Sequence, residues 1–440
     1  MKFSSKTAIT KMQAIIIAMV IVVAGIGAAA YYLTRPQPVL TPIKIGYIGN
    51  LSWPIAETAS YVAKLAVDEI NEAGGILGRN ITLIVEDSKG EVPTAVAAYR
   101  KLVMTDGVLS VIVAEGSELN FACQEEGAKL YPEYPHLCCN PCTSHIGLTE
   151  NVLNNYDKYK FYFRNFINTT DYWTHIIENE MIMINNLKPK KMALIIEDAL
   201  WTKIFREGQP GAFPPFKELI EKQLGVQVVY YTETAVTEKM FLPIFEAIAA
   251  TQPDYIHFLG AYSDDAALVK QWASSAAKDI DLYVQGGYCQ TPGYWEMTGG
   301  AALGIVTSYY AVKAAITNKT VPYMNALEKK YGKQPNWVCS GTYDWIYMLK
   351  EAIEKCKTTD VETLIKELEK MEYTGVVGCR RYYPGTHSAV YSPGDLTKGT
   401  IDLRIQYQKN GEIVVVYPKD VAERTNPGKG FISIKVLRGT

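Results

Sequence analysis

The spacing of apolar residues along the chain changes repeatedly between that of a helix and that of a strand. This pattern predicts alternating helices and strands. Between residues 62 and 70 the apolar spacing is that of one face of a helix. Gly74 and Gly75 end this helix, because glycine tolerates the left-handed conformation at a helix C-terminus. The apolar run 81–85 then predicts a strand, and 43–48 predicts another before the helix. Units of this kind build parallel sheets whose ligands lie beyond the carboxyl ends of the strands.

The same alternation continues over most of the chain. Further strands are predicted at 108–114, 191–197, 226–231, 255–259, 282–284 and 304–309, and helices at 216–224, 241–250, 264–278, 345–356 and 361–371. Near the C-terminus, residues 400–416 alternate apolar and polar positions around Asn410-Gly411, which is a strong hairpin signal. A chain of 440 residues is too long for one core. We therefore expect an α/β protein with two Rossmann-like lobes.

The N-terminus contains one uncharged stretch, Ala14 to Leu33, which is long enough to cross a bilayer. Three lysines precede it and only Arg35 follows closely, so a retained membrane helix (residues 1–33) would leave the rest of the chain outside the cytoplasm. The alternative is a cleaved signal peptide with residues 28–30 as its small-residue site. Lipid attachment through cysteine is excluded, since the first cysteine is Cys123. Residues 34–42 contain three prolines and predict a stiff spacer.

Charge and motifs exclude several functions. The chain carries 44 basic and 46 acidic residues, a net charge of −2, without a basic block that would favour nucleic acid. It has neither the Gly-x-Ser-x-Gly and His-Glu-x-x-His motifs nor a phosphate loop or dinucleotide fingerprint. We expect neither catalysis nor a cofactor.

A specific signature lies at the end of the first helix. The pattern Val-Asp-Glu-Ile-Asn-x-x-Gly-Gly-Ile-x-Gly-Arg is unbroken from Val67 to Arg79, and the Leu-Ser-containing loop 51–54 precedes it. Weaker matches follow in order at 147–150, 255–260 and 385–387. In these residues the chain resembles the solute-binding proteins of ABC importers, in the branched-chain amino acid (Leu/Ile/Val-binding) class of the type I periplasmic-binding fold. The resemblance covers about residues 43 to 420.

The resemblance implies a three-segment hinge between the lobes, with crossovers near residues 165, 294 and 378. Lobe 1 would comprise 43–165 and 295–378, and lobe 2 would comprise 166–294 and 379–440. It implies a monomer at the extracytoplasmic face of the membrane that delivers a small solute, amino acid-like or amide, to ABC permease subunits. A ligand-sensing ectodomain with a partner signalling protein is the alternative, and an extracellular enzyme is a third.

The resemblance also implies site residues in lobe 1. Ser117 matches a serine that donates its hydroxyl to the ligand carboxylate, although a plain helix cap would explain it too. Cys142 and Ser144 fall where the family carries a Ser-Pro-x-Ala-Thr-like loop. By loop position, the remaining candidate site residues in lobe 1 are Ser52, Trp53 and Glu115.

In lobe 2, Trp201 and Tyr262 match tyrosines that line the family's cleft, although core packing would also explain them. Tyr288 stands where amino-acid-binding members place a carboxylate against the ligand's ammonium. This departure speaks against an ordinary α-amino acid, unless Glu115 or Asp171 supplies the acid. Asp171 is a candidate by loop position only.

The chain contains eight cysteines, and an exported protein with that number favours disulfides. Cys139-x-x-Cys142 has metal or redox spacing, with further cysteines and histidines near it. A single such motif is weak evidence for a metal site, which needs four converging ligands. We expect a structural disulfide, with buried thiols as the alternative and no metal.

Overall fold

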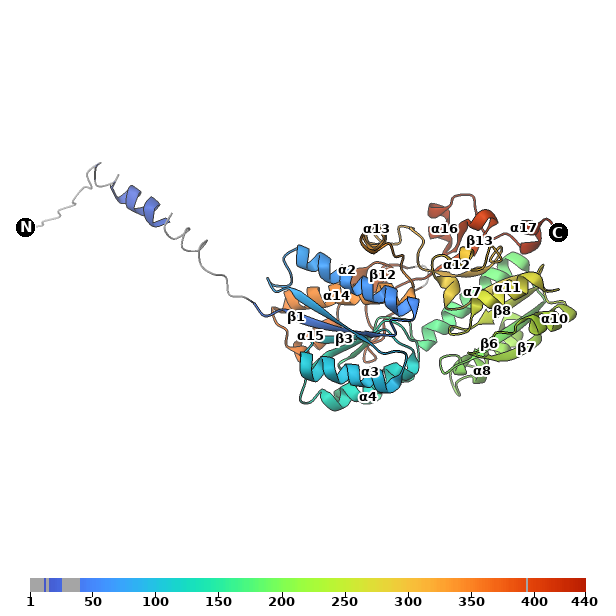
Figure 1. The fold of residues 1–440 in the computed structure, drawn as a ribbon, viewed down its shortest axis with the longest axis horizontal. Helices are drawn as coiled ribbons and strands as arrows, with labels where there is room; N and C mark the ends of the chain where they lie inside the picture. Colours follow the sequence, from blue (N-terminus) through green and yellow to red (C-terminus); the bar gives the residue numbers. More distant parts are fainter. Residues whose placement is uncertain (1–11, 13–15, 26–39, 393–394) are drawn as a thin grey trace, which may run out of the picture. The chain divides into compact units, whose positions relative to one another are not determined.

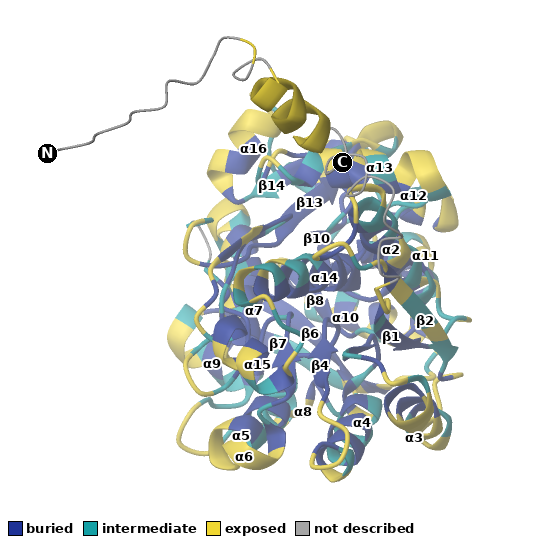
Figure 2. Cartoon of the chain, turned by 90° about the vertical axis from the view of Figure 1, so that its left-hand side faces the viewer, coloured by how far each residue is buried: buried dark blue, intermediate teal, exposed yellow. Residues whose placement is uncertain are grey.

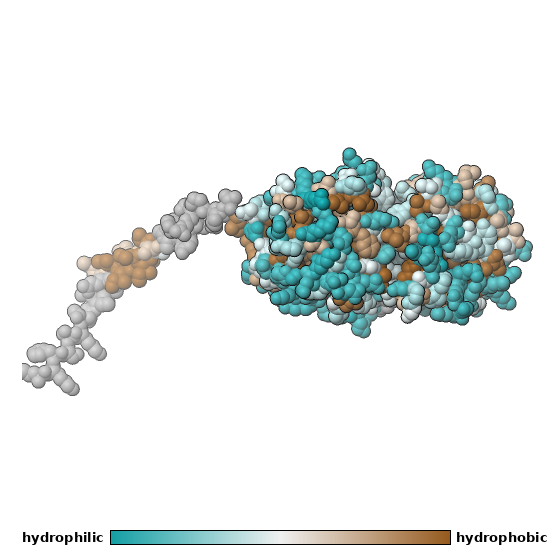
Figure 3. Space-filling view, turned by 90° about the horizontal axis from the view of Figure 1, so that it is seen from below, coloured by the Kyte–Doolittle hydropathy of each residue, from teal (hydrophilic) through white to brown (hydrophobic). Residues whose placement is uncertain are grey.

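The computed structural model describes Met12 and residues 16–25, 40–392 and 395–440. Two compact units are present, Met1–Thr41 and Pro42–Thr440. In the first, residues 16–25 form an exposed helix of apolar residues (Figure 3). Over the described residues, the structure holds no helix long and apolar enough to span a membrane. The described part of the predicted span at 14–33 therefore does not support a membrane helix, and the remainder lies outside the described residues, as does most of the spacer.

Lobe 1 is built on a five-stranded sheet with the strand order β2-β1-β3-β4-β5, in which all neighbours are parallel. Its strands are β1 (Ile43–Gly49), β2 (Ile81–Asp87), β3 (Ser110–Val113), β4 (Leu137–Asn140) and β5 (Tyr162–Arg164). The intervening helices are α2 (Pro54–Glu72), α3 (Val92–Arg100), η1 (Lys101–Asp106), α4 (Ser117–Leu130), α5 (Gly147–Asn154) and α6 (Tyr156–Tyr159). Helix α2 lies on one side of the sheet and α3 with α4 on the other (Figure 1). Coverage of both faces explains why β3 and β4 are buried throughout.

Lobe 2 is built on a seven-stranded sheet with the order β14-β13-β10-β9-β8-β6-β7. Its strands are β6 (Lys191–Asp198), β7 (Gln227–Ala235), β8 (Tyr255–Leu259), β9 (Asp281–Gln285), β10 (Val306–Tyr309), β13 (Leu403–Tyr407) and β14 (Ile413–Tyr417). The first five are parallel, whereas β13 and β14 run antiparallel to their neighbours. The helices of this region are α7 (Thr169–Leu187), α8 (Lys203–Glu207), α9 (Phe216–Leu219), η2 (Ile220–Leu224), α10 (Leu242–Thr251), α11 (Asp265–Ser274), η3 (Tyr288–Gln290), α12 (Tyr294–Met297), η4 (Lys409–Gly411), α16 (Lys419–Thr425) and α17 (Ile434–Arg438). Buried strands of both sheets are dark blue in Figure 2.

Helices α13 (Thr320–Tyr331), α14 (Trp337–Cys356) and α15 (Val361–Leu368) return to lobe 1, where α14 packs along α2. The small sheet of β11 (Tyr373–Gly375) and β12 (Gly378–Arg380) follows. One predicted boundary is wrong: β10, which the crossover at 294 assigned to lobe 1, pairs with β9 and β13 in the sheet of lobe 2. A buried strand of four residues does not reveal its sheet, because distant partners decide how it pairs. The crossovers at 165 and 378 stay predictions.

The expected disulfide is also absent, because all eight cysteines are free thiols. Cys138 and Cys139 are consecutive on β4, so their side chains point to opposite faces of the sheet. Burial raises the pKa of Cys138 to about 12. Over the described ranges, no group of three or more His, Cys, Asp or Glu side chains is placed to hold a metal ion.

Candidate ligand-binding site

A cavity lies where loops of both lobes meet, with about 560 Å³ of empty space that includes its opening to solvent. Lobe 1 contributes the segments after β1, β3, β4 and β5 and the start of α14. Lobe 2 contributes the start of α7 and the segments after β6, β8, β9 and β10. The lining residues are Trp53, Gly116, Cys142, Thr143, Ser144, Phe166, Tyr172, Trp201, Gly260, Ala261, Tyr262, Gln285, Gln290, Tyr310 and Trp337. Most of them follow the carboxyl end of a parallel strand, where α/β folds bind ligands.

The lobe 1 side of the cavity presents hydrogen-bond donors. Helix α4 begins at Ser117 after Gly116, and no side chain caps its first turn. Its first N–H groups therefore remain available at the cavity wall, as at other helix N-termini that bind anions. The Ser117 hydroxyl is fully buried and lies 2.5 Å from the Thr143 hydroxyl. Ser117 thus orients the Thr143 hydroxyl. Thr143 lines the cavity, and Ser117 lies behind it.

The loop after β4 is fixed by its own hydrogen bonds. The Asn140 side chain accepts from the N–H groups of Cys142 and Thr143, each at 2.9 Å, and donates to the Thr143 carbonyl at 2.9 Å. The buried Arg164 guanidinium donates to the Ser144 carbonyl at 2.9 Å. Burial raises the pKa of the Cys142 thiol well above its usual range, so the thiol is protonated and neutral at the cavity wall.

On the lobe 2 side, the buried carboxylate of Glu197 holds the loop after β8. It accepts from the N–H groups of Ala261 at 3.0 Å and Tyr262 at 2.9 Å, and from the Ser263 hydroxyl at 2.7 Å. The loop carries Tyr262 up to lobe 1, where a Cβ on Gly116 would lie 2.6 Å from the Tyr262 hydroxyl oxygen. Glycine at 116 therefore permits this close approach of the two lobes.

Seven of the lining residues are aromatic: Trp53, Phe166, Tyr172, Trp201, Tyr262, Tyr310 and Trp337. In lobe 1, the rings of Trp53 and Trp337 meet edge to face, with centroids 5.9 Å apart and an interplanar angle of 67°. In lobe 2, Tyr172 and Trp201 do the same at 5.6 Å and 80°. The Trp201 indole nitrogen is buried and has no hydrogen-bond partner among the described residues.

The lining contains no Asp, Glu, Lys, Arg or His. Glu115 is buried behind the wall and accepts a hydrogen bond from the Ser88 hydroxyl, and burial raises its pKa. Asp171 accepts from the Tyr383 hydroxyl at 2.9 Å, and burial raises its pKa to about 6. Neither acid lines the cavity. The lining is therefore without formal charge, and aromatic rings make up much of it.

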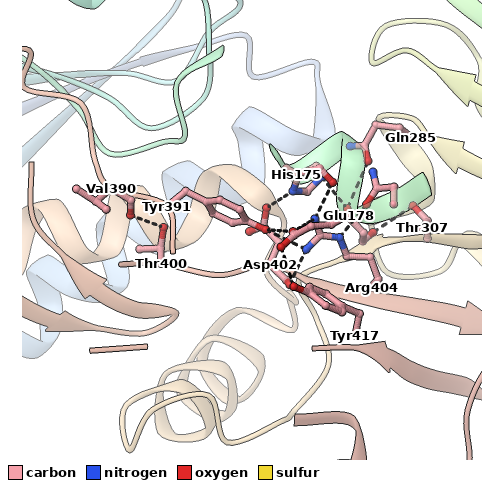
Figure 4. Close-up of polar contacts among 12 residues, drawn as sticks. His175, Glu178, Gln285, Thr307, Val390, Tyr391, Thr400, Asp402, Arg404 and Tyr417 are labelled. Atoms are coloured by element: carbon pink, nitrogen blue, oxygen red, sulfur yellow. Dashed lines mark hydrogen bonds and ion pairs between the residues drawn. The ribbon is translucent and has the colours of Figure 1, made fainter. Parts of the chain in front are cut away.

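A buried ionic network lies behind one cavity residue, Gln285 (Figure 4). The Arg404 guanidinium on β13 pairs with Glu178 of α7 at 3.0 Å. His175 lies 3.2 Å from Asp402, and its other ring nitrogen is 3.3 Å from the Ser308 hydroxyl. That hydroxyl donates to the Gln285 side chain at 3.4 Å. Burial lowers the pKa of His175.

Five of the ten predicted site residues line this cavity, namely Trp53, Cys142, Ser144, Trp201 and Tyr262. Ser52, Glu115 and Tyr288 line an adjoining hollow that shares Trp53 and Tyr262 with it. Ser117 lies one hydrogen bond behind the wall, and Asp171 lines neither space. That any of them contacts a ligand stays a prediction.

Several lining residues were not predicted, among them Tyr172, Gln285, Tyr310 and Trp337. The sequence could have indicated two of these residues, because ligands bind beyond the ends of parallel strands. Gln285 directly follows the predicted strand 282–284, and Tyr310 follows the predicted strand 304–309. Trp337 opens α14, far from the other loops in sequence, and only the packing of α14 on α2 brings it to the site.

Fold and site together define a two-lobed α/β protein with a cavity between its lobes. A family model described as periplasmic binding protein matches residues 42–129 and 215–393. The chain therefore belongs to the periplasmic binding protein family.

Curated relatives and solved structures agree with this assignment. The chain is 24% identical over 339 residues to the Leu/Ile/Val-binding protein homolog 3 of Brucella melitensis, across 76% of this chain and 83% of that protein. It is 22% identical to the leucine-specific-binding protein of Salmonella typhimurium, across 81% and 90%.

Among solved structures, the substrate-binding protein LivJ of Streptococcus pneumoniae in complex with isoleucine superimposes with a TM-score of 0.68 at 19% identity, covering 86% of this chain and all of that one. A solute-binding protein of Rhodopseudomonas palustris in complex with 3,4-dihydroxybenzoic acid gives 0.64 at 18% identity, covering 85% and 95%. These likenesses confirm the type I periplasmic-binding fold. Their ligands differ in charge, one a zwitterion and the other an acid without an amine.

Proposed function

We propose that this protein is the extracytoplasmic solute receptor of an ABC importer. It captures an amino acid or a related small carboxylate or amide between its lobes and delivers it to the permease subunits. The observation that carries this proposal is the uncharged cavity, which both lobes build from loops at the carboxyl ends of their strands. We place the lobes outside the cytoplasm, as expected for a member of the periplasmic binding protein family.

The two lobes contribute different groups to the cavity wall, and together these groups would capture the solute. The lobe 1 side offers the first turn of α4 and the Thr143 and Ser144 hydroxyls to an acceptor-bearing end of the solute. The lobe 2 side brings Trp201 and Tyr262 against the remainder. Because one solute contacts both lobes, binding stabilises the closed arrangement over an open one, and the permease can distinguish the two.

The proposal is tested on the purified full chain by native mass spectrometry, which detects a co-purified small molecule. Small-angle scattering then compares the protein stripped of that molecule with the reloaded protein. We expect a one-to-one complex and a smaller radius of gyration on reloading. The absence of any bound solute, together with an unchanged scattering profile across a panel of amino acids, amides and small acids, would contradict a receptor function.

A further inference from the structure

We propose that the solute carries a fully alkylated ammonium group at one end and a carboxylate at the other, as in a trimethylammonium carboxylate. This inference rests on the proposed function and specifies the solute for the same cavity. Three observations carry it: the absence of charge in the lining, the arrangement of the aromatic rings, and the position of the unused donors.

The first observation argues against a primary ammonium. Such a group has three N–H donors and a charge, and burying it without an anionic partner is costly. The lining supplies no carboxylate, and the two acids predicted for the site are bonded elsewhere, Glu115 to Ser88 and Asp171 to Tyr383. A quaternary ammonium has no N–H group to satisfy, so it needs no acceptor at all.

The second observation is the shape of the aromatic wall. Each lobe contributes two rings set steeply to one another, Trp53 with Trp337 at 67° and Tyr172 with Trp201 at 80°. Steeply set rings present faces from different directions, which fits a rounded group better than a flat one lying between parallel walls. The faces of tryptophan and tyrosine attract cations, tryptophan most strongly, and aromatic cages are a known means of binding quaternary ammonium.

The third observation places the carboxylate. The uncapped first turn of α4 adjoins the cavity at Gly116, next to the Thr143 and Ser144 hydroxyls. Across the cavity, the Trp201 indole nitrogen is buried without a partner among the described residues. All of these groups donate hydrogen bonds and none is charged. Neutral donors of this kind hold a carboxylate through charge-assisted hydrogen bonds.

Isothermal titration calorimetry on the full chain, stripped of co-purified solute, tests the inference with four probes. These are glycine betaine, its tert-butyl isostere in which carbon replaces the nitrogen, leucine, and acetamide. We expect glycine betaine to bind most tightly. The isostere has the same shape and carboxylate but lacks the cationic charge, so its affinity should be about 10- to 30-fold lower. Equal binding of the isostere, or tighter binding of leucine or acetamide, overturns the inference.

Variants then test the rings. Trp53→Leu and Trp337→Leu should each weaken glycine betaine binding about tenfold while changing the affinity of the isostere much less. Tyr134→Leu removes an exposed ring outside the cavity and is the matched control. Circular dichroism and thermal unfolding confirm that each variant is folded. If both probes lose affinity equally, the rings act only as an apolar surface and the inference is refuted.

The same experiments separate this inference from the proposed function. If leucine binds best and scattering shows compaction, the receptor function stands and the alkylated ammonium is refuted. If native mass spectrometry finds a co-purified solute without a quaternary nitrogen, the inference fails in the same way. If no solute is found and no probe binds, both fail.

Discussion

Glu197→Gln should strongly destabilise lobe 2, because the Glu197 carboxylate holds the loop after β8. It is fully buried and accepts hydrogen bonds from the backbone of Ala261 and Tyr262 and from Ser263. In the variant, one carboxylate oxygen becomes an NH₂ group that faces backbone N–H donors. At least one buried N–H then loses its partner, which costs about 1–3 kcal/mol. The remaining bonds change from charge-assisted to neutral, at about 1 kcal/mol each.

These contributions give a loss of about 4 kcal/mol in the free energy of unfolding. Urea denaturation followed by circular dichroism measures it as a lower midpoint at constant slope. Glu233→Gln, on the neighbouring strand β7, is the matched control, since Glu233 is exposed and pairs with Arg206 at the surface. We expect that control to change stability by less than about 0.5 kcal/mol.

The variant should also weaken ligand binding, because Ala261 and Tyr262 line the cavity and lose their anchor. The calorimetric affinity for the co-purified solute is therefore expected to fall in Glu197→Gln and to stay constant in Glu233→Gln. If Glu197→Gln unfolds within about 1 kcal/mol of the parent protein, the carboxylate does not hold this loop.

Three further predictions concern the site and its surroundings. Ser117→Ala removes the partner of Thr143, so calorimetric affinity should fall about two- to tenfold with little change in stability, and an unchanged affinity would show that Thr143 needs no such support. Burial raises the pKa of Asp265 to about 7, so the folded protein binds this proton more tightly than the unfolded chain does. Stability from this group should therefore fall as pH rises from about 4 to 7, and thermal unfolding across that range should show a shallower fall in Asp265→Asn. Because all eight cysteines are free thiols, a reducing agent should leave the unfolding temperature unchanged, and a large decrease would reveal a disulfide.

The sequence by itself determined the local elements and the family. Period and glycine placement predicted α2 and the strands on either side of it, since amphipathic spacing and helix ends depend on neighbouring residues. The unbroken pattern from Val67 to Arg79 pointed to the periplasmic binding proteins, which the family model confirms. The resemblance to this family also pointed to Trp201 and Tyr262, and both line the cavity.

Only the tertiary structure decided which distant segments meet. The pairing of β10 with β9 and β13 moved a predicted lobe boundary, because strand partners are chosen across long sequence separations. The free thiols follow from the directions of buried side chains, which cysteine spacing does not encode. The packing of helix α14 brings Trp337 to the cavity. Glu197 anchors a loop that lies more than sixty residues further along the chain. The uncharged lining is likewise a property of the assembled cavity, since Glu115 and Asp171 lie on nearby loops yet bond away from it.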